Sequence, residues 1–126
     1  MLASQLLNSM NVKQNVDAVI LSSILVNKTE DLEFFNVEKN ISESEIQKEY
    51  ESRGLVPANP YALFLYAREN PAFAGKCPYG THWEDQRGRW CHAVFYQWFG
   101  KREADVKYSS TGIWGKDFQF VGVKRK

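Results

Sequence analysis

The sequence predicts an α+β fold in which N-terminal helices pack on a C-terminal antiparallel sheet of about four strands. Residues 1–58 carry 5 basic and 9 acidic side chains and three aromatic residues, whereas residues 59–126 carry 11 basic and 6 acidic side chains and 15 aromatic residues. Apolar residues recur at helical spacing in the first part, and aromatic runs separated by glycine turns dominate the second. The 126 residues therefore predict a single domain, 1–126, with an acidic, mainly helical part and a part that adds one helix and a basic, aromatic-rich sheet.

Two helices are expected near the N-terminus. Residues 14–26 carry apolar side chains at three- and four-residue spacing, which indicates one buried helix face. These side chains are Val16, Val19, Ile20 and Ile24. Residues 2–10 form a shorter candidate helix, and the segment 29–40 is left open between a strand and a packed loop.

The helix expected over residues 42–53 has the clearest boundaries. Ser42 followed by Glu45 is a capping box, in which each side chain bonds the backbone N–H of the other, and Gly54 is a natural C-terminal stop. A narrow apolar stripe predicts a surface helix, with the carboxylates of Glu43 and Glu45 on its solvated face.

The stripe of this helix consists of Ile46 and Tyr50. Residues 56–60 then read as a hinge-like link, and residues 61–69 as a helix with an asparagine cap and a proline at its first position.

Strands are expected at 81–85, 89–99, 104–109 and 118–123, with turns at 86–88 and 100–103. In the second strand, alternation places Trp90 and His92 on one face and Cys91 on the other. Both faces are largely apolar, so the sequence leaves open which one is buried.

Charge and motifs exclude several functional classes. The formal net charge of +1 excludes a histone-like basic protein and an acidic DNA mimic. The N-terminus has no secretory signal, and the most apolar stretch, 16–26, is too short to span a bilayer. We therefore expect a cytoplasmic protein (host cytoplasm if phage-encoded) with no membrane association, and the absence of phosphate-binding glycine motifs predicts no cofactor.

The cysteines and histidines are the only candidates for metal or thiol chemistry. Cys77, His82, Cys91 and His92 suffice in number for zinc, but their spacing lacks the paired ligands of zinc sites. Cys91 with His82 as base could form a nucleophilic pair. The default expectation is two small buried thiols, no metal and no catalytic residue.

Basic and aromatic residues are interleaved in the predicted sheet, as in proteins that bind single-stranded nucleic acid. The candidate nucleic-acid-binding residues are Arg87, Arg89, Trp90, Tyr96, Lys107 and Tyr108. Interspersed carboxylates and the modest net charge weaken this alternative.

Protein binding uses residues of the same types, because Trp, Tyr and Arg dominate interface hot spots. Trp98 and Trp114 lie near turns and are expected to be exposed. The candidate partner-binding residues are Trp98, Lys101, Arg102, Trp114 and Lys116, expected at one end of the sheet. A homodimer built on an exposed strand edge or helix is left open.

Three short segments of the second half carry a resemblance. They are Asn70-Pro71-Ala72-Phe73-Ala74, Gly80-Thr81-His82-Trp83 and Gly88-Arg89-Trp90-Cys91. With these segments the chain resembles small uncharacterised proteins of tailed bacteriophages and prophages. The resemblance implies a small non-enzymatic accessory factor that binds and modulates a host or partner protein.

Overall fold

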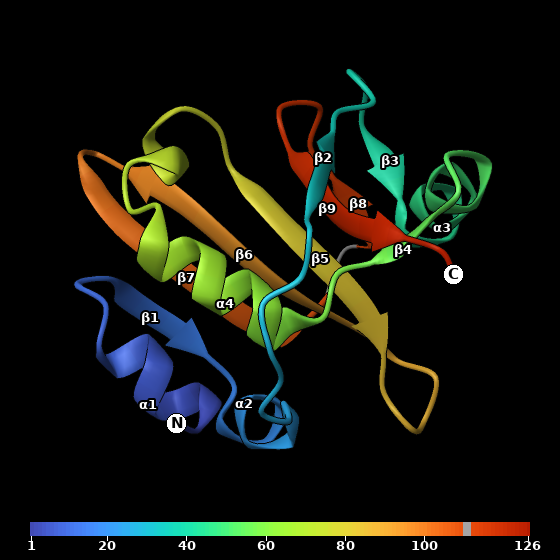
Figure 1. Ribbon diagram of the computed structural model, residues 1–126. Helices are drawn as coiled ribbons and strands as arrows, with labels where there is room; N and C mark the ends of the chain where they lie inside the picture. The colour runs from blue at the N-terminus through green and yellow to red at the C-terminus, as the bar shows by residue number, and fades with distance from the viewer. Residues whose placement is uncertain (110–111) are drawn as a thin grey trace.

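The computed structural model describes residues 1–109 and 112–126 as an α+β fold whose helices are interspersed among the strands (Figure 1). The elements in chain order are α1 (Ala3–Asn8), β1 (Lys13–Val16), α2 (Ala18–Ser23), β2 (Glu33–Phe35), β3 (Ile41–Ser42), α3 (Glu43–Ser52), β4 (Leu55–Pro57), α4 (Pro60–Glu69), η1 (Phe73–Gly75), β5 (Tyr79–Glu84), β6 (Trp90–Trp98), β7 (Lys101–Tyr108), β8 (Ile113–Trp114) and β9 (Gln119–Lys124). Over these described residues, no helix has the length and apolar character needed to cross a membrane.

The main sheet is mixed and larger than the sequence predicted. It has seven strands in the order β1-β7-β6-β5-β9-β2, with β4 also paired to β9, and β3 and β8 form a separate two-stranded sheet. All four predicted strands are present as β5, β6, β7 and β9. The expectation of a purely antiparallel four-stranded sheet is wrong, because β1 runs parallel to β7 and β5 runs parallel to β9.

The N-terminal segment departs most from expectation. Residues 14–26 do not form one helix, because residues up to Val16 extend along the edge of β7 and the helix starts only after Asp17. The Asp17 carboxylate accepts hydrogen bonds from the backbone N–H groups of Val19 and Ile20, which is an N-cap. Val19, expected on the buried face, is 72% exposed. The edge of β7 offers backbone hydrogen bonds that a periodicity argument does not consider.

The predicted link at 56–60 is also part of the sheet. Residues 55–57 form β4, which pairs antiparallel with β9, so the segment is not a hinge. The turn between β6 and β7 is shorter than predicted and consists of Phe99 and Gly100, with φ of 48° and 78°. Two central residues with positive φ are typical of a type I′ hairpin turn, which matches the twist of the flanking strands.

The two central helices are confirmed. Ser42 caps α3, with Glu45 completing the capping box, and Gly54 follows with φ of 69°. Asn59 caps α4 and Pro60 is its first residue.

Each face of the main sheet has its own hydrophobic core. On the first face, Ala93 and Phe95 of β6 and Val121 of β9 pack with α1, α2 and α4, which lie together on that side (Figure 1). On the second face, Val94 and Phe120 pack with α3 and the small β3–β8 sheet. Strand β6 is therefore buried on both faces near its middle, with Cys91, Ala93 and Phe95 on one face and Val94 on the other, while Gln97 and Trp98 at its hairpin end are exposed.

Close contact between β5 and β6 leaves no room for a side chain at Gly80. A Cβ atom on Gly80 would lie 2.6 Å from the backbone oxygen of Ala93, whereas a Cβ on Gly115 would lie no closer than 3.7 Å to the Phe118 ring. We expect Gly80→Ala to lower the free energy of unfolding by about 1–3 kcal/mol, because the two strands must separate. Gly115→Ala is the matched control and should change it by less than about 0.5 kcal/mol. Urea denaturation followed by circular dichroism measures both.

Candidate functional site

A cavity of about 550 Å³ lies against the second face of β6 and β7. We call the end lined by Glu43, His92 and Trp114 of β8 the inner end, and the end lined by Trp98 and by Ala74 and Gly75 of η1 the outer end. Its aromatic walls are Tyr96, Trp98, Trp114 and Phe118. The volume falls within the range of about 300–1,000 Å³ that is typical of ligand sites.

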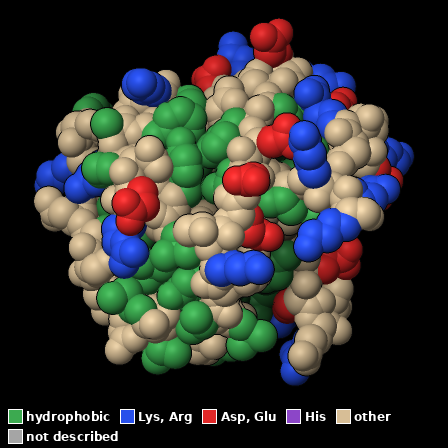
Figure 2. Space-filling model, in the orientation of Figure 1, with side chains coloured by type: hydrophobic (Ala, Val, Ile, Leu, Met, Phe, Trp, Pro, Cys, Tyr) green, Lys and Arg blue, Asp and Glu red, His purple; other side chains and the backbone are tan. Residues whose placement is uncertain are grey.

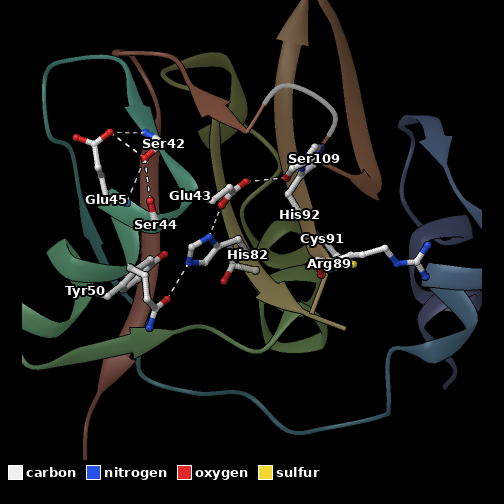
Figure 3. Close-up of polar contacts among 12 residues, drawn as sticks. Ser42, Glu43, Ser44, Glu45, Tyr50, His82, Arg89, Cys91, His92 and Ser109 are labelled. Atoms are coloured by element: carbon white, nitrogen blue, oxygen red, sulfur yellow. Dashed lines mark hydrogen bonds and ion pairs between the residues drawn. The ribbon is translucent and has the colours of Figure 1, made fainter. Parts of the chain in front are cut away.

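The Glu43 carboxylate joins three separate parts of the chain at the inner end of this cavity (Figure 3). Glu43 is the first residue of α3 and is only 5% exposed. Its Oε2 lies 2.5 Å from Nδ1 of His82 on β5, and its Oε1 accepts a hydrogen bond of 2.7 Å from the hydroxyl of Ser109. The pairing of β3 with β8 brings these groups together, and the backbone N–H of Glu43 donates to the Gly112 oxygen.

The environment keeps this buried carboxylate ionised. Burial by itself raises the pKa of Glu43, but hydrogen bonds from His82 and Ser109 outweigh it, so the pKa lies below its usual value. The buried indole N–H of Trp114 also lowers the pKa of Glu43, although it is too distant or poorly aligned to form a hydrogen bond. The start of α3 adds the positive end of a helix dipole.

The ring of His82 has stacking partners, and both of its nitrogens contact other side chains. Its ring stacks on Trp90 at 4.3 Å and on Tyr50 at 5.5 Å between centroids. Its Nε2 lies 3.1 Å from the Gln47 side-chain oxygen, so each ring nitrogen lies against a side-chain oxygen.

His92 connects to this network through Ser109. Its Nδ1 lies 2.9 Å from the Ser109 hydroxyl oxygen, and its ring lines the cavity. Since Ser109 gives its only proton to Glu43, Nδ1 of His92 is the donor and its Nε2 is left with a lone pair. Burial lowers the pKa of His92, which favours this neutral form.

A second polar group lies further along the same face. The Tyr96 hydroxyl and the Asn15 amide each bridge the carboxylates of Glu103 and Asp105, at 3.0–3.3 Å. Lys107 Nζ lies 3.6 Å from Asp105. Burial and the adjacent Asp105 raise the pKa of Tyr96. The charged groups on this wall are therefore already paired with each other.

The predicted partner-binding residues do not all lie on one surface in the structure. Trp98 is 60% exposed, as expected, and Lys101 lies opposite it across the hairpin. Trp114 is only 4% exposed, so its expected exposure is wrong: it packs against Phe118 and Phe120. Trp98 and Trp114 both line the cavity, whereas Arg102 and Lys116 do not.

The predicted nucleic-acid-binding residues do not form one surface. Tyr96 and Lys107 face the cavity beside carboxylates, and Tyr108 belongs to the opposite face of the sheet. Arg89 lies 4.1 Å from the Tyr108 ring centre and pairs with Asp85. Arg87 is exposed in the β5–β6 turn, and Trp90 is half-buried on His82.

Cys91 and His82 cannot form the nucleophilic pair considered from the sequence. His82 is in register with His92 and faces the Glu43 side, while Cys91 is buried in the core on the other face. Burial raises the pKa of the Cys91 thiol to about 11 and also raises that of Cys77. In the ranges 1–109 and 112–126, no three His, Cys, Asp or Glu side chains are grouped to hold a metal ion.

Sequence reasoning missed Glu43 and Ser109 and gave His92 no role in a hydrogen-bonded network. The expectation that Glu43 lies on a solvated helix face is wrong. A signal existed, because Glu43 precedes Ile46 and Tyr50 by three and seven residues and so shares their helix face.

Comparison of the chain with protein-family models, with curated protein sequences and with solved structures gives no match. The class of protein must therefore be argued from the cavity and the surface around it.

Removal of the buried carboxylate tests whether it holds the second face together. We expect Glu43→Gln to lower the free energy of unfolding by about 2–4 kcal/mol at neutral pH, because His82 loses its charged partner inside the protein. Glu51→Gln, an exposed position on the same helix, should change it by less than about 0.5 kcal/mol. Equal losses in the two variants in urea denaturation would contradict this role.

The stability that Glu43 contributes, measured as the difference between the wild type and Glu43→Gln, should depend on pH. Because the pKa of Glu43 is lowered in the folded state, its contribution is complete above the usual carboxyl pKa of about 4.3 and is lost as the pH falls through the folded value. The stability difference between the wild type and Glu43→Gln should be constant near neutral pH and shrink in acid. A difference that grows in acid would contradict the assignment.

Thiol labelling tests the burial of Cys91. We expect Ellman's reagent at neutral pH to react slowly with Cys77 and not with Cys91 until the protein is unfolded, because burial disfavours both thiolates. The Cys77→Ser variant isolates the second thiol. Rapid labelling of this variant in its folded state would contradict an inert Cys91.

Proposed function

We propose that the protein is a non-enzymatic binding protein and that a partner protein docks on the tip of the β6–β7 hairpin and the cavity beside it. One observation carries this proposal: Trp98 and Phe99 are 60% and 88% exposed at the end of a tight two-residue turn, and Trp98 also lines the cavity. Large aromatic side chains next to a pocket are typical of interface hot spots.

The hairpin presents these rings on a firm support. β6 and β7 are paired from Cys91–Tyr108 to Trp98–Lys101, so the tip is an extension of the main sheet (Figure 1). Trp98 and Phe99 contact each other edge to face, with ring centres 4.8 Å apart. A preformed aromatic edge loses little conformational freedom on binding.

The charges around the cavity favour a protein over a nucleic acid as the partner. Two carboxylates, Glu43 and Asp105, and two lysines, Lys76 and Lys107, line the cavity, so its wall has no excess of positive charge to attract a phosphate backbone. The resemblance to small phage proteins agrees with a host protein as the partner and directs the search to bacterial lysates.

Replacement of the two exposed rings tests the proposal. Asn in place of Phe99 suits the positive φ of the turn, so the double variant Trp98→Ala/Phe99→Asn should keep the hairpin while it loses the aromatic edge. We expect the wild type to retain a discrete bacterial protein in an affinity pull-down after nuclease and high salt. The double variant should lose at least about tenfold in retention, since each hot-spot ring contributes about 2 kcal/mol or more.

Val19→Ser is the matched control, because Val19 is an equally exposed apolar side chain on α2. It is one of the exposed apolar residues Met1, Leu2, Val19, Leu25 and Val26, and apolar side chains are visible over α1 and α2 in Figure 2. Capture that survives in the double variant and fails in Val19→Ser would place the interface on α1 and α2. Capture abolished by nuclease in the wild type would support nucleic-acid binding.

A further inference from the structure

The inner end of the cavity holds an acceptor atom that the protein itself does not use. Ser109 and Glu43 fix the proton of His92 on Nδ1, and Nε2 accepts no hydrogen bond from any residue in the described ranges. The other polar groups nearby are committed: Tyr96 donates to the carboxylates of Glu103 and Asp105. The Trp114 N–H is buried against Glu43 and is not accessible to a ligand.

The walls around this acceptor suit a planar ring. The rings of Trp98, Tyr96, Trp114 and Phe118 surround the space, and Val94 completes the floor. Aromatic rings prefer edge-to-face or offset contacts with one another. A ligand that satisfies both the walls and Nε2 is an aromatic ring that carries a hydrogen-bond donor. Among protein side chains, tyrosine carries its O–H at the tip of the ring, where it can reach the inner end of the cavity, whereas the N–H of tryptophan lies at the side of its larger ring system.

We infer that the cavity is the receptor for a tyrosine side chain of the partner protein, whose phenol O–H donates to Nε2 of His92. This inference rests on the proposed function, since it names the side chain that would enter beside the hairpin tip. Ser109 and Glu43 act as positioning residues, because they hold His92 in the tautomer that accepts.

Small analogues of side chains test the cavity without a known partner. In an NMR titration that follows the backbone amide resonances of β6 and β7, p-cresol, the analogue of tyrosine, should bind about three- to tenfold more tightly than toluene, the analogue of phenylalanine. His92→Phe should remove this preference while the cavity keeps an aromatic ring at the position. Trp98→Ala should weaken both ligands equally, because it removes wall area and leaves the acceptor in place. Equal affinities in the wild type would overturn the inference.

A pH titration of the wild type gives a second test that does not depend on a folded variant. The charged and titratable groups that act on His92 are Asp105, Glu43, Lys107 and His82. Protonation of His92 turns Nε2 from an acceptor into a donor and reverses the hydrogen bond with the phenol, so the preference for p-cresol should change as the pH falls through the pKa of His92, below its usual value of about 6.5. The affinity for toluene should not change over that range. A preference of constant size across this pH range would overturn the role of Nε2.

Amino acids with blocked termini test whether the cavity accepts a side chain that is attached to a peptide backbone. N-acetyltyrosinamide should bind with the same preference over N-acetylphenylalaninamide. Binding of p-cresol without binding of N-acetyltyrosinamide would overturn the assignment to a partner protein. Failure of both ligands would overturn the inference while the hairpin variants in the pull-down still decide the proposed function.

Discussion

The second face of the sheet depends on the contacts that the ionised carboxylate of Glu43 makes with His82 and Ser109. This carboxylate joins the start of α3 to β5 through His82 and to the end of β7 through Ser109, three segments that are far apart in the sequence. A buried charge of this kind is stable only while its partners stay in place, so it demands one arrangement of the surrounding chain. The tautomer of His92 depends on that arrangement, because Ser109 gives its proton to Glu43.

Local signals predicted the parts of the fold that local interactions decide. The capping box at Ser42 and the Asn59-Pro60 start mark helix ends within a few residues, and the glycine turns divide the aromatic half into strands. The N-terminal strand β1 and the short strand β4 carry no comparable pattern. They are strands because β7 and β9 offer free backbone groups at their edges, and that pairing spans most of the chain.

The candidate site was harder to predict because its members come from separate elements. Exposure of Trp98 followed from its place beside a turn, but Trp114 lies beside a turn too and is buried by Phe118 and Phe120. Glu43 was treated as a surface carboxylate, although its helical spacing to Ile46 and Tyr50 placed it inward. A charged side chain can be buried when the protein supplies hydrogen-bond partners for it, as His82 and Ser109 do for Glu43.

The parallel pairing of β1 with β7 has a consequence for the order in which the protein can fold. Asn15 is in register with Asp105, 90 residues further along the chain, so β1 has no partner until β7 has been synthesised. During synthesis the N-terminal segment must remain unpaired, with its apolar residues accessible to chaperones or to neighbouring chains. This edge of the sheet forms only after β7 has been made, and such long-range closure is typical of slow folding.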